Sequence, residues 1–309
     1  SEHFNGFKVD KDASINHAIT DGFGSLRMTF HNYKKNSPEG RKFNSSDESR
    51  LYTKISNSTF QPESLEISLS DKANMEYVSL DSNYKIDGSI KDVYSSCIMK
   101  DSSSLKLNSI RNNYKGIMNN DYVVYADSFM GNSSAEISST ADVYDFLGNG
   151  TFEKKKVSDY ANLKTDITSR TFKIPVITEN STNLSSIEIT KNGSVRQLFD
   201  SCNISTPQSR TKQILRDEAN MYTSYSQCDI CAAGIDEEIS GNSKLTKEYN
   251  NHKLSCGEDG YLETLTLSGQ GLLEISQTNT KRELFNVKDK YILDWKLTDD
   301  SKVESNCNG

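Results

Sequence analysis

The sequence has no long hydrophobic run and few residues of the types that commonly carry catalysis. No stretch approaches the roughly 20 consecutive apolar residues of a membrane-spanning helix, so no such span is expected. Only four histidines occur in 309 residues, which makes the most frequent general base of enzymes scarce. The chain also lacks a Gly-x-Ser-x-Gly motif, a P-loop and a His-Glu-x-x-His motif. These absences argue against the common hydrolase and nucleotide-dependent mechanisms.

Positive charge is not concentrated anywhere in the chain. The formal net charge is -7, and the longest basic run is Lys154–Lys156. Because phosphate backbones are bound by clustered lysine and arginine, we expect no nucleic-acid partner. Hydrophobic residues make up 34% and charged residues 26%, yet 15 tyrosines and 12 phenylalanines are present. This composition predicts folded, β-rich modules with thin cores rather than a disordered chain.

The clearest local pattern is Tyr144–Glu153, in which apolar residues alternate on either side of a Gly-x-Gly sequence. Alternation places every second side chain on one face of a strand, and glycine adopts the positive φ angles of a tight reversal. The stretch therefore predicts an antiparallel β-hairpin.

A similar pattern recurs at Leu265–Glu274, 121 positions further on. The alternating stretches that begin at Phe172 and Leu293 have the same offset of 121. Two separated features with one spacing indicate a duplicated unit of about 120 residues. Chance alternation, which is common in β proteins, is the competing interpretation.

We therefore expect a mainly β fold of tandem antiparallel barrel- or sandwich-like units. The expected units are 1–85, an incomplete N-terminal copy; 86–205; and 206–309, which includes a cysteine-rich region. One helix is predicted near 207–224, because Thr206 and Pro207 are a favourable N-cap and first helical residue. Apolar residues then recur at helical spacing.

Six cysteines are compatible with up to three disulfides and an extracytoplasmic location, whether secreted, periplasmic or surface-exposed. The disulfide candidates are Cys97, Cys202, Cys228, Cys231, Cys256 and Cys307, with the pairing left open. Unpaired buried thiols are one alternative. A zinc site formed by Cys202, Cys228, Cys231 and Cys256 is another, and a redox Cys-x-x-Cys at 228–231 is a third. The disulfide interpretation is preferred, with no metal and no cofactor.

Other candidate residues have simpler structural interpretations. Trp295, the only tryptophan, invites a sugar-stacking role, but its alternating position favours the core. The acidic groups Asp299–Asp300 and Asp236–Glu238 lack the spacing of a calcium loop and are expected to be solvated. His17 and His31 belong to no nucleophile motif. No catalytic or ligand-binding residue is assigned.

Part of the chain resembles lipocalin-like β-barrel modules of bacterial cell-envelope proteins. The resemblance rests on Tyr144-Asp-Phe146 with Gly148 and Gly150, and on Trp295-Lys-Leu297. It covers about a third of the chain, and the glycines follow the aromatic pair sooner than in that pattern. The resemblance implies a small barrel or sandwich, a binding role and no enzymatic activity.

The function expected from these observations is non-enzymatic binding by a secreted or cell-surface protein. Loops on the β modules would bind a glycan, an envelope component or a partner protein, as in adhesion, and repeated sites would add multivalency. The alternatives are a structural or assembly protein of the envelope without a small-molecule site, and a hydrolase of an extracellular polymer.

Overall fold

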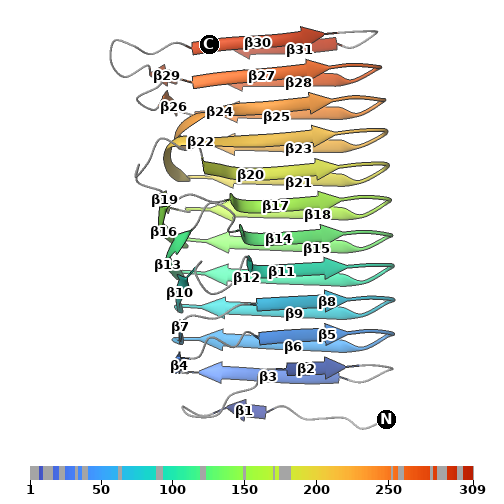
Figure 1. Ribbon diagram of the computed structural model, residues 1–309, viewed down its shortest axis with the longest axis vertical. Helices are drawn as coiled ribbons and strands as arrows, with labels where there is room; N and C mark the ends of the chain where they lie inside the picture. Colours follow the sequence, from blue (N-terminus) through green and yellow to red (C-terminus); the bar gives the residue numbers. More distant parts are fainter. Residues whose placement is uncertain are drawn as a thin grey trace.

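All strand pairs in the computed structural model are parallel among the residues that the structure describes, and the chain winds into a β-solenoid (Figure 1). The described residues are 7–9, 17–20, 25–31, 34–36, 41–61, 65–87, 93–118, 123–148, 151–169, 171–173, 182–251, 253–256, 261–278, 281–283, 291–297 and 302–308.

One face of the solenoid is a 12-stranded parallel sheet, here called sheet A. Each of its strands pairs with the strand one circuit earlier and the strand one circuit later. The strands are β1 (Phe7–Val9), β3 (Ser25–His31), β6 (Arg50–Ser56), β9 (Asn74–Leu80), β12 (Ser104–Ile110), β15 (Ser134–Thr140), β18 (Asn162–Thr168), β21 (Ser194–Asp200), β23 (Asn220–Ser226), β25 (Lys244–Asn250), β28 (Leu272–Thr278) and β31 (Lys302–Asn308).

The other 19 strands form a second parallel sheet with two parts. The front strands are β2 (His17–Thr20), β5 (Arg41–Ser45), β8 (Leu65–Leu69), β11 (Val93–Met99), β14 (Val123–Phe129), β17 (Thr151–Val157), β20 (Thr182–Ile189), β27 (Tyr261–Leu267) and β30 (Tyr291–Leu297). The side strands, on the left of Figure 1, are β4 (Lys34–Asn36), β7 (Thr59–Gln61), β10 (Asn83–Asp87), β13 (Asn113–Met118), β16 (Val143–Gly148), β19 (Thr171–Lys173), β26 (Lys253–Cys256) and β29 (Lys281–Glu283). The long strands β22 (Asn203–Leu215) and β24 (Asp229–Ile239) contribute to both parts.

One circuit of the chain, here called a rung, contains a front strand, a tight turn, a sheet A strand, a corner and a side strand. In the tight turn after β8, the Ala73 N–H donates to the Ser70 carbonyl at 3.0 Å. The Lys72 N–H donates to the backbone carbonyl of Asp47 in the preceding rung at 2.9 Å. The turn backbone is therefore paired from rung to rung, as the strands are. Successive rungs lie about 4.8 Å apart, the usual distance between paired strands.

The core lies between the inward faces of sheet A and the front strands. Near the tight turns, sheet A contributes one row of apolar side chains and the front strands contribute a second one. The first row includes Leu51, Met75, Leu105, Leu163, Val195, Met221, Leu245 and Leu273, and the second includes Leu69, Met99, Phe129, Val157, Ile189, Leu215, Ile239 and Leu267. All these side chains are buried, and each contributes about 1.5–3 kcal/mol relative to an exposed position.

The antiparallel barrels or sandwiches expected from the sequence, including those implied by the lipocalin-like resemblance, are wrong. β16 pairs in parallel with β13 and β19, whereas β17 pairs in parallel with β14 and β20. The stretch Tyr144–Glu153 thus crosses from a side strand to a front strand instead of reversing as a hairpin. Apolar and polar residues alternate along a half-buried strand whether its neighbours are parallel or antiparallel. The alternation alone therefore did not show that the strands pair in parallel.

The offset of 121 residues aligned positions that are not equivalent. Tyr144 lies in a side strand, with Tyr114 and Phe172 as register partners. Leu265 lies in front strand β27, with Glu237 and Trp295 as partners. The repeating element is a rung of 24 to 32 residues. The equivalent turn residues Asp47 and Asp71 are 24 positions apart, and Asp159 and Lys191 are 32 positions apart. The unit boundaries expected at 85 and 205 fall within strands β10 and β22.

The helix predicted near 207–224 is also wrong, because these residues belong to β22, a tight turn and β23. The pairing of β22 with β24 shifts in register between Thr206 and Arg210, and Pro207 lies in this irregularity. Proline lacks the N–H that a regular ladder requires, so it is accommodated where the strand changes from one face to the next. Pairing on both sides of β22 overrode the local helical pattern.

Candidate functional site

One half of each rung has a constant length. The tight turn contains a residue with positive φ, such as Asp47 (φ 56) or Asp217 (φ 67), and the corner contains another, such as Asn57 (φ 49) or Gln227 (φ 53). The turn and corner residues are ten positions apart in each described pair from 47/57 to 241/251. Sheet A and its two bends therefore form an invariant frame.

All the variation in rung length lies in the other half, between a corner and the next tight turn. This half spans 14 positions from Asn57 to Asp71, and 22 positions from Ser169 to Lys191. The difference is shared between the lengths of the strands and the length of the segment that joins a side strand to the next front strand. We call this boundary between the two strands the insertion edge. In β22 and β24 the two strands are continuous, so those rungs have no intervening segment.

The segments at the insertion edge range from two to eight residues between the strand ends. They are 37–40, 62–64, 88–92, 119–122, 149–150, 174–181, 257–260 and 284–290. These segments lie outside the described residues. The side strands that precede them are stacked on one side of the solenoid, so the described strand ends before the segments lie on that side (Figure 1). In repeat proteins, insertions of variable length on one side of a constant frame often form the binding face. The insertion edge is therefore the candidate functional site.

Charged and polar side chains on the front strands border this edge. The Arg210 guanidinium donates to Asp236 through Nε at 3.0 Å and also through an Nη group. The Thr264 hydroxyl, one rung further on, donates to the same carboxylate. Lower in the solenoid, Lys42 and Glu66 form an ion pair at 2.7 Å. These contacts join outward side chains of consecutive rungs.

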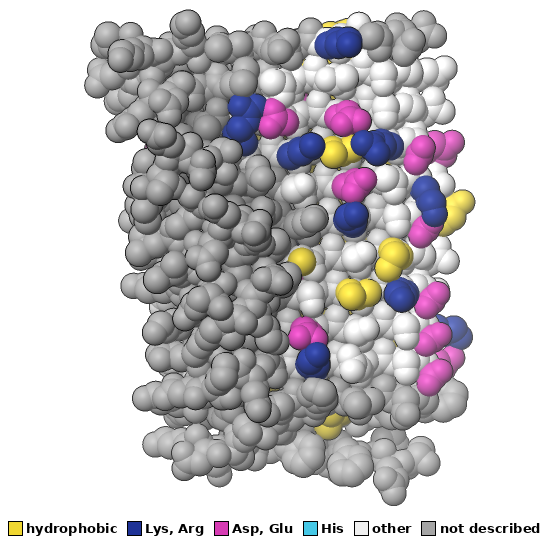
Figure 2. Space-filling model, viewed as in Figure 1, with side chains coloured by type: hydrophobic (Ala, Val, Ile, Leu, Met, Phe, Trp, Pro, Cys, Tyr) yellow, Lys and Arg dark blue, Asp and Glu magenta, His cyan; other side chains and the backbone are white. Residues whose placement is uncertain are grey.

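Surface charges of both signs are interspersed over the described part of the face in Figure 2. Most of the ion pairs join residues on consecutive rungs. They include Lys42–Glu66, Lys72–Glu48, Arg111–Asp81, Lys156–Glu188, Lys191–Asp159, Arg216–Glu238 and Lys244–Glu274. These charges thus neutralise one another along the solenoid. The expectation that the protein has no nucleic-acid partner stays a prediction.

These pairs predict that the protein is less stable in acid. Hydrogen bonding from Arg111 lowers the pKa of Asp81, and hydrogen bonding from Lys191 lowers the pKa of Asp159. A carboxylate with a lowered folded-state pKa stabilises the fold above its ordinary pKa of about 4, and this contribution is lost as the pH falls through the lowered value. Thermal melting between pH 7 and pH 2 is expected to show the loss.

The Arg111→Gln variant is expected to lose part of this pH dependence, because its Asp81 carboxylate no longer has a cationic partner. Lys100→Gln, at an exposed position in a tight turn, is the matched control and should retain the full dependence. Identical melting profiles of Arg111→Gln and the native protein at every pH would contradict the assignment.

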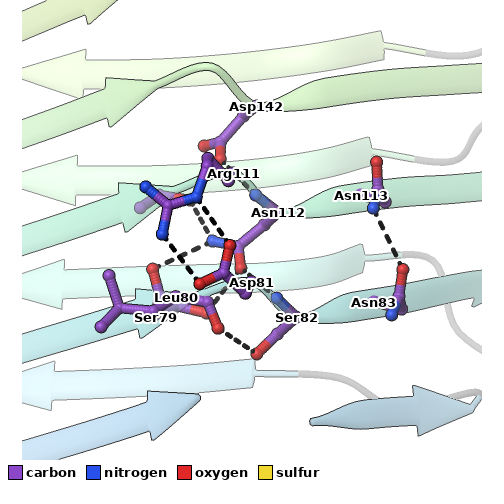
Figure 3. A network of polar contacts seen from close by, with 10 residues as sticks. Ser79, Leu80, Asp81, Ser82, Asn83, Arg111, Asn112, Asn113 and Asp142 are labelled. Atoms are coloured by element: carbon purple, nitrogen blue, oxygen red, sulfur yellow. Dashed lines mark hydrogen bonds and ion pairs between the residues drawn. The ribbon is translucent and has the colours of Figure 1, made fainter. Parts of the chain in front are cut away.

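The corner residues carry a buried hydrogen-bond network (Figure 3). The Asn112 side-chain oxygen accepts from the Ser82 N–H at 2.8 Å, and its amide donates to the Ser79 carbonyl at 3.1 Å and to the Ser109 hydroxyl at 2.8 Å. One rung further on, Asp142 accepts from the Asn112 N–H at 2.8 Å. The network satisfies the backbone where the chain bends, so its role is structural.

Charged residues also occur inside the solenoid. Lys247 of sheet A pairs with Glu237 of β24, and their side chains are 4% and 0% exposed. Asp127 and Lys155 are buried and lie on the register-paired strands β14 and β17. Glu237 belongs to the acidic group expected to be solvated, and that expectation is wrong for this residue. Alternation would have placed Glu237 opposite Asp236 and Glu238, but the sequence does not say which face is inward.

Three of the six cysteines, Cys97, Cys202 and Cys228, have described side chains, and all three are buried in their thiol form. The structure therefore contains no disulfide between any of these three. Cys97 lies in a front strand, far in the sequence from the other two, which occupy corners of consecutive rungs. The side chains of Cys231, Cys256 and Cys307 lie outside the described residues, so the full set of disulfide candidates stays a prediction.

The remaining candidates contribute no site in the described part of the chain. No group of three or more histidine, cysteine, aspartate or glutamate side chains that could hold a metal occurs there. The side chains of Trp295, His17 and His31 and the residues Asp299–Asp300 lie outside it. The described residues also include no helix long and apolar enough to cross a membrane. The insertion edge was missed because its signal is rung length, which becomes visible only once the turns are aligned.

Comparisons with family models, with curated proteins and with solved structures found no match to this chain.

Proposed function

We propose that this protein is a non-enzymatic binding scaffold whose insertion edge contacts a glycan, an envelope component or a partner protein. One observation carries the proposal: the frame from tight turn to corner has a constant length, whereas the insertion edge varies from rung to rung. A rigid β scaffold that presents variable segments side by side is a common arrangement for recognition. The expected location is extracytoplasmic.

Repetition favours attachment to an extended partner. The strands that flank these segments are paired about 4.8 Å apart on successive rungs, so contacts that are weak singly would act together at a high effective concentration. The partner is therefore expected to be a chain or a surface rather than a small molecule.

The test exchanges insertion segments while keeping the frame. Segment 174–181, the longest between described strands, is replaced by a two-residue Asn-Gly link, the length that joins β16 to β17. The scaffold is expected to keep its circular dichroism spectrum and to melt within a few degrees of the native protein, because loop length contributes little to stability. Binding on a glycan array or to immobilised envelope material should fall at least about tenfold, a loss of about 1.4 kcal/mol.

The matched control changes the opposite side of the solenoid. Asn162→Ala and Asn220→Ala remove exposed outward side chains at the start of β18 and β23, away from the insertion edge. These variants should bind as the native protein does. If they lose binding while the 174–181 exchange keeps it, the binding surface is sheet A and the proposal is wrong.

A structural role in the envelope, as a spacer without a small-molecule site, is the second candidate. The ion pairs between consecutive rungs favour this role, because in them surface charges bind the neighbouring rung and strengthen the solenoid. A spacer would tolerate exchange of every insertion segment without loss of function. Shortening the solenoid by whole rungs would impair it.

A further inference from the structure

Cys202 and Cys228 occupy equivalent places in the fold. Each follows the positive-φ residue of a corner, Ser201 (φ 54) or Gln227 (φ 53). The strands before the two corners, β21 and β23, are paired in register up to Asp200 and Ser226. The backbone pairing continues through the corner, because the Asp229 N–H donates to the Cys202 carbonyl at 2.9 Å. The two cysteines are therefore neighbours on consecutive rungs.

Both thiols are buried at their corners and contact backbone carbonyls there. Both residues are 2% exposed. The Cys202 thiol donates to the Asp200 carbonyl at 3.4 Å, and the Cys228 thiol donates to the Ser226 carbonyl at 3.3 Å. Neighbouring strands place Cα atoms about 4.8 Å apart, inside the range of about 4.4–6.8 Å found for disulfides.

Cys97 provides an internal contrast. It is buried to a similar extent, at 6% exposure, but its register partners on the neighbouring rungs are Ile67 and Asp127. No cysteine is adjacent to it in that row. If Cys202 and Cys228 are oxidised to a disulfide and Cys97 is not, the difference is therefore due to the closeness of the two corner thiols and not to their burial.

We propose that Cys202 and Cys228 form an oxidation site, at which a peroxide converts the two thiols into a disulfide that links consecutive rungs. One sulfur attacks a peroxide oxygen, the O–O bond breaks, and a sulfenic acid and one water form. The second sulfur attacks the sulfenic sulfur, the S–S bond forms, and the hydroxyl leaves as a second water. The two thiols lose two electrons and two protons, and the peroxide is reduced to two waters.

The surroundings keep the pair reduced until it meets such an oxidant. Hydrogen bonding from Cys202, together with burial, raises the pKa of the Cys228 thiol. The nucleophilic thiolate is therefore rare, and reaction requires a brief opening of the corner. Once formed, the bond would close a loop of one rung and restrict the unfolded chain.

The test treats the folded protein with hydrogen peroxide and maps its peptides by mass spectrometry without reduction. We expect a product about 2 Da lighter, in which the peptides that contain Cys202 and Cys228 are joined. The oxidised protein is expected to melt several degrees higher, and reduction should reverse the shift. Cys202→Ser and Cys228→Ser should each abolish the joined peptide, whereas Cys97→Ser, the matched control, should retain it.

Three outcomes would overturn the proposal. In the first, peroxide converts Cys202 and Cys228 separately to sulfinic acids without joining them. In the second, the joined peptide forms only after unfolding in guanidinium chloride. In the third, the folded Cys97→Ser protein loses the joined peptide as completely as Cys202→Ser does. None of these outcomes bears on the insertion edge, so the binding proposal is tested separately.

Discussion

Replacing Lys247 with methionine is expected to lower the free energy of unfolding by about 3–5 kcal/mol, because the substitution leaves the Glu237 carboxylate buried without its cation. The two side chains meet inside the solenoid, with exposures of 4% and 0%. A charge removed from water in this way is tolerated only when it is paired. Equilibrium unfolding in urea, followed by circular dichroism, measures the change.

Two further variants separate this effect from the loss of a lysine in general. Lys244→Met, on the same strand, breaks a half-exposed pair with Glu274 and should lower stability by no more than about 1 kcal/mol. The double variant Glu237→Leu, Lys247→Met replaces the whole pair with apolar groups and should recover most of the loss. A Lys247→Met protein within about 1 kcal/mol of the native one would contradict the buried ion pair.

Replacing Asn112 with alanine is expected to lower the free energy of unfolding by about 2–4 kcal/mol, since each buried polar group left without a partner costs about 1–3 kcal/mol. The substitution removes the acceptor of the Ser82 N–H and the donor to the Ser79 carbonyl. The same urea titration measures this change.

Asn113 provides the matched control for that experiment. It is the next residue in the chain and is exposed, and its side-chain amide donates to the Asn83 side-chain oxygen at 3.1 Å. Asn113→Ala should change stability by less than about 0.5 kcal/mol. Equal effects of the two substitutions would contradict a structural role for the buried corner network.

The sequence contained enough to predict strands with alternate residues inside. Sheet A strand β6 shows this directly, because Leu51, Thr53 and Ile55 are buried and the residues between them are not. The parallel pairing could not be obtained in this way. Residues 144 and 265 have similar neighbours in the chain, yet they lie in different strands of the rung.

The turns concealed the true repeat, because glycine was taken as the marker of a reversal. Most positive-φ positions in the described residues carry other side chains, such as Asp71, Asp101 and Arg111. Aspartate tolerates this conformation and is stabilised here, since the Asp71 N–H donates to the Asp101 carboxylate of the next rung at 3.3 Å. The signal of a tight turn is a residue with positive φ and, two positions later, a small buried residue. Asp71 is followed in this way by Ala73, and Asp101 by Ser103.

Which polar residues lie inside also depends on the winding of the chain. Lys155 belongs to the longest basic run of the sequence, and it is 3% exposed. Its strand neighbour Lys156 points outward and pairs with Glu188. The sequence shows that the two side chains are on opposite faces, but only the position of β17 in the solenoid shows which face is buried.

The most direct test of the architecture is a set of distances between spin labels, introduced as unnatural amino acids at outward positions of sheet A. Arg50, Asn74, Asn220 and Lys244 occupy one register row. Asn74 and Asn220 are five rungs apart, so a separation of about 24 Å is expected. The separation should rise to about 29 Å from Arg50 to Asn220 and to about 34 Å from Arg50 to Lys244. Distances that do not increase by one strand spacing per rung would contradict the parallel solenoid, and with it the insertion edge.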